Sequence, residues 1–367
     1  MTENELLSKV IAEYFDATKI KEIIELKGGH INSTYLIKME ETEYILQKIN
    51  HHVFPSPYGM MHNIMEVTDY IRKKLVYNGL DPDRHTLNIQ KTTYGQILCI
   101  RDDTYWRCMR YIGDAIAYDK AESADIMYEI GCAVGNFQNL LDGFHTRILD
   151  EIIPHFHDTL NRYKNLCTVL KFDEHDRAKD CADLIKYVHK NRKQYDLITD
   201  AIRTKKIPRR VAHNDTKPSN ILIDEKTKKQ LCLIDLDTVM RGSVLFDFGD
   251  ALRIGASTCA EDERDLTKVG VNFEYFRAFV KGFLEYSISY LKQEEIDMLV
   301  DGFYLITLEC GMRFLTDYID GDTYFKISYP DHNLVRAKCQ ITFAKEIDKH
   351  RAELRQIIDE TLEELRK

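Results

Sequence analysis

The sequence predicts an α+β fold of two lobes, with a small β-rich N-terminal lobe over residues 1–110 and a larger, mainly helical C-terminal lobe over residues 111–367. The chain has 367 residues, more than one hydrophobic core usually serves. Short apolar runs fill its first third, and helical periodicity takes over from Asp119. Two β-rich runs return between residues 211 and 237, and they carry many polar side chains.

The N-terminal lobe begins with an expected amphipathic helix over residues 3–17. Segment 20–50 then holds three short apolar runs, which predict a hairpin turning at Gly28 and Gly29 and a third strand after it. We expect a loop over residues 51–59, because Pro55 and Pro57 disfavour regular structure there. The remaining expected elements are a helix over 61–77 and strands over 86–91, 96–100 and 104–112.

The C-terminal lobe shows apolar residues at helical spacing in several long segments. These segments are 121–141, 155–169, 174–202, 261–292 and 294–318. The tail, residues 344–367, combines charges at i, i+4 with a leucine and isoleucine stripe, which predicts a helix that caps the fold. A dimer helix is the alternative, so the sequence allows a monomer or a homodimer.

The composition excludes several classes of protein. A net charge of -9 argues against nucleic acid or an anionic membrane as the main partner. No window approaches the roughly 18 apolar residues of a membrane span. The nine cysteines are odd in number and none forms a C-x-x-C pair, which disfavours a disulfide framework or structural zinc and favours a reducing cytoplasm.

The stretch HNDTKPSN at residues 213–220 has the spacing of a phosphoryl-transfer loop, H-x-D-x-K-x-x-N, with Asn214 where protein kinases have Arg. Twenty residues after Asp215, the apolar run LCLI ends at Asp235. Magnesium prefers hard oxygen ligands such as a carboxylate and an amide. Taken alone, the motif also fits an Asx-rich turn between two strands.

From this chemistry we assign a role to each residue. Asp215 is expected to orient the acceptor hydroxyl and take its proton, and Lys217 to neutralise the transferred phosphate. Asn220 and Asp235 are the expected ligands of Mg²⁺. His213 is expected to brace the loop.

A second acidic segment follows this motif. Asp247 opens a D-F-G triplet 32 residues after Asp215. Asp235 fits the metal role better, because an apolar run that ends at a carboxylate makes a rigid ligand mount. Asp247 is therefore expected to tie down the loop, with direct metal binding as the alternative. Asp237 is an alternative ligand for a second ion.

Several stretches together resemble the aminoglycoside phosphotransferase and choline kinase superfamily. They are HNDTKPSN, LIDLDTVMRG and DFGDALR, and further similar stretches are GGHINSTYLI, EYILQKINHHVF, HNIMEV and GMRFLTDYIDGDTYF. Within that superfamily the chain looks most like the N-acetylhexosamine 1-kinases. The resemblance implies a protein-kinase-like fold and ATP-dependent phosphorylation of the anomeric 1-hydroxyl of an amino sugar, GlcNAc or GalNAc. It also implies that Arg313 and Tyr324 contact the sugar.

The chain departs from the protein-kinase pattern on its third strand, which lacks V-A-I-K. In EYILQKI, alternation places Gln47 rather than Lys48 toward the nucleotide, so either Gln47 contacts a phosphate or another cation serves. Glu66, the candidate partner for such a lysine, is correspondingly doubtful. Gly28, Gly29 and Asn32 form the nearest counterpart of a glycine-rich phosphate loop, with an ordinary hairpin turn as the alternative.

The connecting strand is expected to offer backbone groups of Met109 to Tyr111 to adenine. Three other functions stay open: a protein kinase, a nucleotide-binding protein without catalysis, and a kinase for choline, homoserine, an aminoglycoside or another sugar. The short distance from Asp235 to DFGDALR and the absence of A-P-E disfavour the protein kinase.

Overall fold

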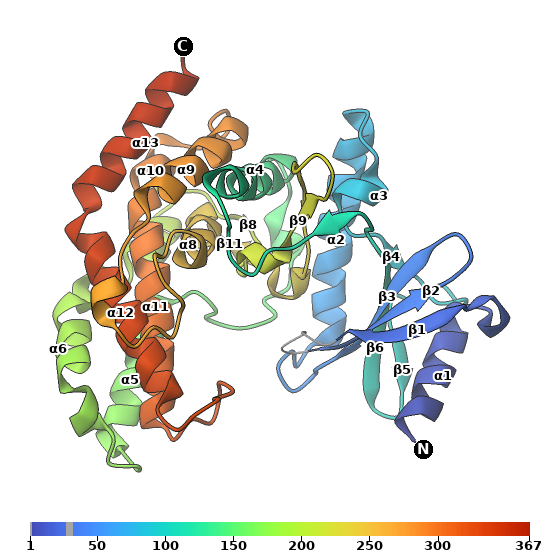
Figure 1. The fold of residues 1–367 in the computed structure, drawn as a ribbon, viewed down its shortest axis with the longest axis horizontal. Helices are drawn as coiled ribbons and strands as arrows, with labels where there is room; N and C mark the ends of the chain where they lie inside the picture. Colours follow the sequence, from blue (N-terminus) through green and yellow to red (C-terminus); the bar gives the residue numbers. More distant parts are fainter. Residues whose placement is uncertain (1, 27–31) are drawn as a thin grey trace.

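The computed structural model describes residues 2–26 and 32–367. Figure 1 shows a sheet with one helix against it at one end of the molecule and most of the helices at the other. The predicted α+β fold, with a small β-rich N-terminal lobe and a larger helical C-terminal lobe, is confirmed. Strand β6 ends at Arg110, and we propose that the boundary between the two lobes lies after this residue, between 110 and 111.

The N-terminal sheet is antiparallel and has the strand order β1-β2-β3-β6-β4, with β5 also pairing with β6. The three predicted runs of segment 20–50 are its first three strands. The strands are β1 (Glu22–Leu26), β2 (Ser33–Lys38), β3 (Glu43–Ile49), β4 (Ile89–Gln90), β5 (Cys99–Arg101) and β6 (Thr104–Arg110). The predicted turn residues Gly28 and Gly29 lie outside the described residues.

Each face of this sheet has a different environment. Helix α1 (Glu3–Tyr14) covers one face, where Leu46 and Trp106 are fully buried. On the other face the register pairs Gln47 with both Thr34 and Arg107. Because paired residues of antiparallel strands share a face, this second face carries polar side chains toward the C-terminal lobe.

Helix α2 (Pro57–Tyr77) begins four residues before the predicted start at residue 61. The predicted loop over residues 51–59 is wrong at its end, because Pro57 lies in the first turn of α2. Proline is favoured in the first turn of a helix because its missing N–H is not needed there, and Ser56 caps this turn. The apolar face of α2 packs into the core of the C-terminal lobe, so α2 joins the two lobes.

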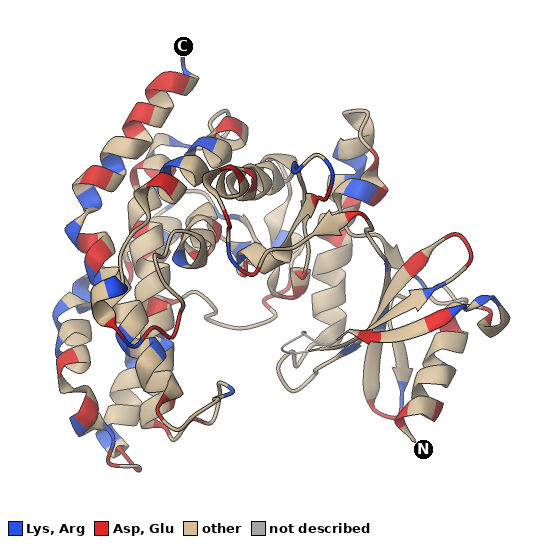
Figure 2. Cartoon of the chain, in the orientation of Figure 1, with Lys and Arg blue, Asp and Glu red and all other residues tan. Residues whose placement is uncertain are grey.

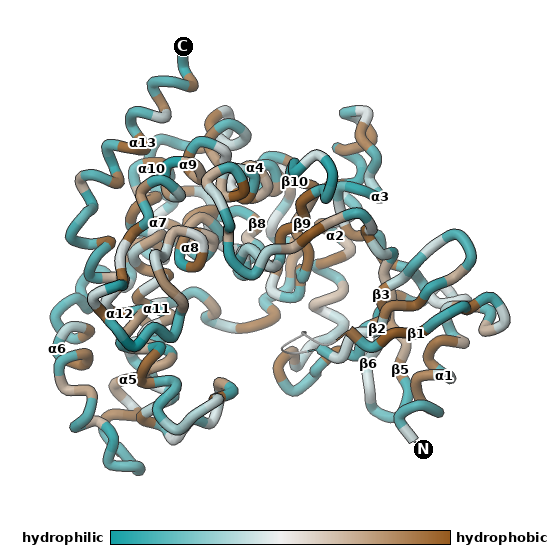
Figure 3. Tube along the Cα trace, in the orientation of Figure 1, coloured by the Kyte–Doolittle hydropathy of each residue, from teal (hydrophilic) through white to brown (hydrophobic). Residues whose placement is uncertain are grey.

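The C-terminal lobe is built from helices around one large core (Figure 3). The helices are α4 (Ala124–Leu140), α5 (Thr159–Phe172), α6 (Ala182–Asn191), α7 (Leu197–Arg203), α8 (Val244–Gly255), α9 (Phe273–Ser287), α10 (Gln293–Asp297), α11 (Leu299–Ile319), α12 (His332–Lys349) and α13 (Arg351–Leu365). The short helix α3 (Pro82–His85) follows α2.

Some of the long predicted helices are interrupted. Segment 174–202 breaks into α6, α7 and short 3₁₀ turns, and segment 261–292 becomes helical only from Phe273. Asn272 caps that later start. Helical periodicity continues across such breaks because both sides bury apolar residues in the same core, so the pattern alone does not locate them.

Short strands inside the helical lobe hold the polar motif. They are β7 (Ala115–Ile116), β8 (Arg210–Ala212), β9 (Ile221–Asp224), β10 (Gln230–Leu233) and β11 (Met240–Gly242). Strand β9 lies between β10 and β7, and β8 pairs with β11. The predicted β-rich interruption over residues 211–237 is confirmed, and HNDTKPSN connects β8 to β9.

The C-terminal tail packs on the fold as a capping helix. Leu354, Ile357, Ile358 and Leu362 of α13 are buried against the core, while the rest of the helix carries charged residues, mostly acidic toward its C-terminal end (Figure 2). Within the described residues, no helix is both long and apolar enough to cross a membrane.

Helices α4 and α9 approach each other closely through glycines. A Cβ at Gly135 would overlap the carbonyl oxygen of Phe283, and a Cβ at Gly131 would overlap that of Phe279. Three residues beyond Gly135, Gln138 donates to the carbonyl oxygen of Val211 (2.9 Å). The close packing of α4 therefore helps to place the strand that enters the polar motif.

Gly135→Ala is expected to destabilise the protein by about 1–3 kcal/mol, because the added methyl group forces two packed helices apart. Urea unfolding followed by circular dichroism measures this loss. Gly270→Ala is the matched control, since its Cβ would meet Thr258 at an ordinary 3.6 Å, and its change should stay within about 0.5 kcal/mol. Equal stabilities of the two variants would contradict the close packing.

Candidate active site

The motif at residues 213–220 is held in place by the side chain of Asp247, a buried residue of α8. Its carboxylate accepts the backbone N–H groups of His213 (3.0 Å) and Asn214 (2.8 Å) and the side-chain amide of Gln138 (2.7 Å). Burial raises the pKa of this carboxyl group, while these donors favour its charged form. Asp247 therefore has the predicted tethering role.

His213 also has a structural role, as expected. Its Nδ1 accepts the backbone N–H of Asp215 (3.3 Å), and its Nε2 donates to the carbonyl oxygen of Ile234 (3.0 Å). Both contacts are satisfied by the neutral Nε2–H tautomer. The buried ring thus fixes the loop that carries Asp215 to the end of β10, which carries Asp235.

Asn214 explains the departure from the arginine of protein kinases. Its φ is 66°, in the left-handed region, where Asn is tolerated much better than most residues. Its side-chain amide donates to the carbonyl oxygens of Ala212 (3.2 Å) and Thr238 (2.8 Å). The residue reverses the chain just before Asp215 and is buried.

Asp215, Lys217 and Asn220 form one cluster. Oδ2 of Asp215 accepts from Lys217 Nζ (3.0 Å) and from the amide of Asn220 (2.8 Å). For Oδ1 of Asp215 no partner is found in the described part of the chain. Desolvation lowers the pKa of Lys217, but the carboxylates of Asp215, Asp235 and Asp250 outweigh it and raise that pKa, so Lys217 is a cation at neutral pH.

Asp235 lies beside this cluster, at the end of β10, with a left-handed φ of 60°. The preceding residue, Ile234, donates its backbone N–H to the carbonyl oxygen of Asn220 (2.8 Å). The side chain is exposed to solvent, yet desolvation by its surroundings and the nearby Asp237 and Asp215 raise its pKa to about 6. A cation bound here would relieve this crowding of negative charge.

The donors available at this point suit a magnesium ion. The Asp235 carboxylate and the side-chain oxygen of Asn220 are hard oxygen ligands, and phosphate oxygens of a bound nucleotide are of the same kind. Residues 2–26 and 32–367 contain no group of three His, Cys, Asp or Glu placed to hold a metal by themselves. A site with two protein ligands, completed by phosphate, fits both observations.

Both carboxylate oxygens of Asp237, the alternative ligand for a second ion, contact side chains of the same chain. It is buried, with one oxygen paired with Nη1 of Arg107 and the other accepting from the amide of Asn32 (2.8 Å). Asn32 in turn accepts the backbone N–H of Asn50 (3.0 Å). Asn32, predicted to bind the nucleotide, thus ties the N-terminal lobe to the C-terminal lobe.

Gln47 is likewise held by protein atoms. Its Oε1 accepts from Nε of Arg107 (2.9 Å), and its Nε2 donates to Thr34 (3.1 Å). Lys48 points to the opposite face, where its Nζ lies 5.9 Å from the centre of the Trp106 ring. Arg107 is therefore the buried cation beside Gln47, a residue that the sequence analysis missed. Its signal was a charged residue between the apolar Trp106 and Cys108 of a central strand.

The predicted adenine-contacting segment lies where β6 leaves the sheet. Met109 is buried, and its register partners are Ile45 on one side and Ile89 on the other. The backbone N–H of Tyr111 already donates to the carbonyl oxygen of Glu43 (2.9 Å). The N–H of Tyr111 is therefore already occupied by a protein acceptor.

The predicted sugar-contacting pair lies on and after α11. The guanidinium of Arg313 stacks over Tyr324 (5.7 Å) and Phe325 (5.2 Å), and Tyr324 is 66% exposed. Arg313 and Tyr324 thus contact each other. An exposed aromatic ring beside a guanidinium offers both a stacking surface and hydrogen-bond donors.

A second missed contact links α11 to the motif. His157 lies between Oε1 of Glu309 (3.0 Å) and the carbonyl oxygen of Asn214 (3.3 Å), and Glu309 also accepts from Thr159 (2.7 Å). Arg313 follows Glu309 by one helical turn, about 6 Å further along the same face of α11. Through His157, Glu309 on this face is joined to the motif at Asn214.

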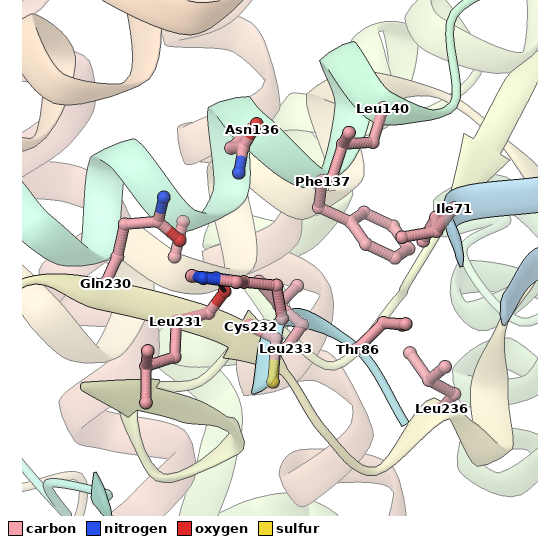
Figure 4. A pocket seen from close by; sticks show the side chains of 12 residues that line it. Ile71, Thr86, Asn136, Phe137, Leu140, Gln230, Leu231, Cys232, Leu233 and Leu236 are labelled. Atoms are coloured by element: carbon pink, nitrogen blue, oxygen red, sulfur yellow. Dashed lines mark hydrogen bonds between the residues drawn. The ribbon is translucent and has the colours of Figure 1, made fainter. Parts of the chain in front are cut away.

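Figure 4 shows a small cavity away from the motif, between α4 and β10, which residues of α2 and α3 also line. It has room for about one water molecule. Its lining includes Ile71, Phe137, Gln230 and Leu233 and none of the residues predicted to act in the reaction.

The family to which the chain belongs follows from a comparison with protein-family models. The model described as the phosphotransferase enzyme family, APH, matches residues 22–277, which include the motif, Asp235 and Asp247. This chain belongs to the phosphotransferase enzyme family. The predicted aminoglycoside phosphotransferase and choline kinase superfamily is thereby confirmed, and its N-acetylhexosamine branch stays a prediction.

Solved structures support the fold of this phosphotransferase over nearly its whole length. A microcompartment-associated aminopropanol kinase is similar with a TM-score of 0.56 and 13% identity, over 96% of this chain and 98% of that one. A choline kinase from Cryptosporidium parvum has a TM-score of 0.57 and 12% identity, over 97% and 98%. Spectinomycin phosphotransferase APH(9)-Ia, solved with ADP and spectinomycin, has a TM-score of 0.55 and 12% identity, over 95% and 99%.

Asp235→Asn is expected to raise the melting temperature of the ligand-free phosphotransferase at pH 8 and to raise it less at pH 5. A raised pKa means that this carboxyl group stabilises the fold at low pH, and that the contribution is lost as pH rises from the ordinary 3.8 through about 6. Asn stays neutral and tolerates the left-handed backbone.

Thermal unfolding between pH 5 and pH 8 measures the difference. Asp265→Asn is the control, because this exposed acid has a lowered pKa through its hydrogen bonds with Thr267 and should not show the same trend. If the melting temperatures of Asp235→Asn and the wild type differed by the same amount at all pH values, the raised pKa of Asp235 would be contradicted.

Proposed function

We propose that this phosphotransferase is an ATP-dependent kinase of a small molecule, and that its acceptor is the anomeric 1-hydroxyl of an N-acetylhexosamine, GlcNAc or GalNAc. The observation that carries the proposal is the cluster in which Oδ2 of Asp215 is held by Lys217 and Asn220, beside the exposed Asp235. This arrangement leaves Oδ1 of Asp215 able to accept a hydroxyl proton while a cation stands next to it.

Each side chain then has a defined task. Asp215 orients the acceptor hydroxyl through Oδ1 and receives its proton, and Lys217 stabilises charge on the transferred phosphoryl group. Asn220 and Asp235 would hold Mg²⁺, which supplies positive charge to the phosphate oxygens. Asp247 and His213 keep these groups in place, so that little reorganisation is needed during the reaction.

The acceptor would lie between the motif and α11. Arg313 follows Glu309 on the face that is joined to the motif through His157, and Tyr324 stacks on Arg313. A guanidinium can donate to sugar hydroxyls or to an acetamido carbonyl, and an exposed tyrosine can stack on a sugar ring. These properties support an uncharged amino sugar as the small-molecule substrate.

Two other functions are distinguished by particular residues. A kinase of choline or another cationic acceptor would place a positive charge near Arg313, which disfavours it. A nucleotide-binding protein without catalysis needs no base, yet Asp215 is held with one oxygen available. Nine free cysteines agree with the cytoplasmic location that we propose.

The test is to incubate the protein with ATP, Mg²⁺ and separate acceptors: GlcNAc, GalNAc, choline, ethanolamine, homoserine and an aminoglycoside. The proposal predicts a new phosphate ester by mass only with a hexosamine, and no ester when the anomeric hydroxyl is replaced by a methyl glycoside. Phosphorylation of another acceptor alone would refute the sugar assignment, and ATP binding without any ester would favour the non-catalytic alternative.

Asp215→Asn is expected to lower turnover by about 10²- to 10⁴-fold, because a positioned base is removed. Binding of ADP should stay within about twofold, since Asn can still accept from Lys217 and Asn220. Steady-state kinetics and calorimetry measure the two quantities. If the variant kept nearly full activity, the base would have to be another residue.

Arg313→Ala is expected to raise the acceptor KM by about 10- to 100-fold, because charge-assisted hydrogen bonds to the sugar are lost. The KM for ATP should stay within about twofold. Arg264→Ala is a matched control, since Arg264 also stacks over a tyrosine, Tyr329 at 4.8 Å, but is exposed on the surface. Equal effects on both KM values would place Arg313 outside the acceptor site.

A further inference from the structure

We propose that Arg107 binds the phosphate groups of the nucleotide, and that it replaces the third-strand lysine of kinases. The inference rests on the proposed function only in requiring a nucleotide, and not on the identity of the acceptor. It also assigns positioning roles to Gln47 and Asp237, which hold the guanidinium without contacting the nucleotide.

The position of Arg107 follows from the register of the sheet. Arg107 lies directly opposite Gln47, the residue at the position where the lysine of V-A-I-K would point inward. Both side chains project from the face opposite α1, and Arg107 reaches Asp237, two residues after Asp235. Arg107, on the strand next to β3, thereby places its charge at the lobe junction, where the lysine of protein kinases would lie.

Two contacts with protein side chains fix the orientation of the Arg107 guanidinium. Nε donates to Gln47, and Nη1 is paired with Asp237. Arg107 is 2% exposed, and within residues 2–26 and 32–367 no hydrogen-bond partner of Nη2 is found. An arginine whose Nε and Nη1 are fixed presents its remaining N–H groups in a known direction, which suits recognition of phosphate oxygens.

Arg107 is joined to the segment that carries the proposed metal ligand, because its ion-pair partner Asp237 lies two residues after Asp235. The buried pair of Arg107 and Asp237 further resembles the lysine–glutamate pair of protein kinases, with the acid supplied by the C-terminal lobe.

Other cations and acids of the N-terminal lobe are less suited to this role. Lys48 lies on the α1 face, over Trp106. The side chain of Glu66 on α2 makes no hydrogen bond or ion pair among residues 2–26 and 32–367. A purely structural explanation of Arg107, as a pin between the lobes, predicts a loss of stability without a selective loss of phosphate binding.

The experiment is calorimetric titration of Arg107→Met with ADP and, separately, with adenosine, both with Mg²⁺. The dissociation constant for ADP should rise by about 10- to 100-fold, because hydrogen bonds to a charged phosphate are lost. That for adenosine should change less than about twofold. Arg107→Lys, which keeps a cation, should recover part of the ADP affinity, whereas a merely structural arginine would not give this selectivity.

Two further variants keep the test decisive. Lys48→Met removes a cation from the adjacent strand on the opposite face and should leave ADP binding unchanged. Because Arg107→Met leaves Asp237 buried without its cation, the double variant Arg107→Met with Asp237→Asn restores neutrality, and its fold is checked by circular dichroism. ADP binding equal to the wild type in folded Arg107→Met, or in the folded double variant, overturns the inference. A wild type that binds no ADP would instead refute the ATP-dependent function.

Discussion

The buried carboxylate of Asp247 is the interaction on which the candidate site depends. It accepts two consecutive backbone N–H groups, those of His213 and Asn214, at the point where the chain turns into the left-handed conformation. Those groups would otherwise be buried without partners, which costs more than an ordinary hydrogen bond contributes. The position of Asp215 is therefore set from α8, and α8 is itself held within the helical core.

The site concentrates negative charge, and the surrounding cations make this tolerable. Desolvation, together with the nearby carboxylates of Asp237 and Asp215, raises the pKa of Asp235 to about 6. Two cations offset this negative charge: Lys217 of the C-terminal lobe, which pairs with Asp215, and Arg107 of the N-terminal sheet, which pairs with Asp237. Such an arrangement is not the most stable one for a protein without ligands, but it is suited to bind a metal and phosphate together.

Much of the fold and of the local motif could be predicted because each depends on short-range patterns. Alternation and turn residues located β1 to β3, and the spacing between Asp215 and Asp235 located the candidate site. The start of α2 was missed because a proline can either interrupt or begin a helix, and the capping Ser56 decides between the two. The breaks within segment 174–202 were missed because apolar periodicity continues through them.

The contacts across the lobe junction could not be predicted, because they depend on which strands are neighbours. The third strand showed that a lysine was missing, but only the pairing of β3 with β6 brings Arg107 next to Gln47. Sequence alternation had already placed Lys48 on the opposite face. Two residues that are 60 positions apart in the chain thus share a task that a single lysine performs in protein kinases.

The contacts of Asp237 with the N-terminal lobe affect how the two lobes can move. Asp237 accepts from Asn32, the residue before β2, and pairs with Arg107 of β6, so one buried carboxylate of the C-terminal lobe holds two points of the N-terminal sheet. A lysine–glutamate pair within the N-terminal lobe would leave that lobe able to move as a unit. Here, any rotation of the sheet away from the C-terminal lobe has to separate a buried ion pair, which is costly. The orientation of the phosphate-facing cation and the closure of the two lobes are therefore coupled through Asp237.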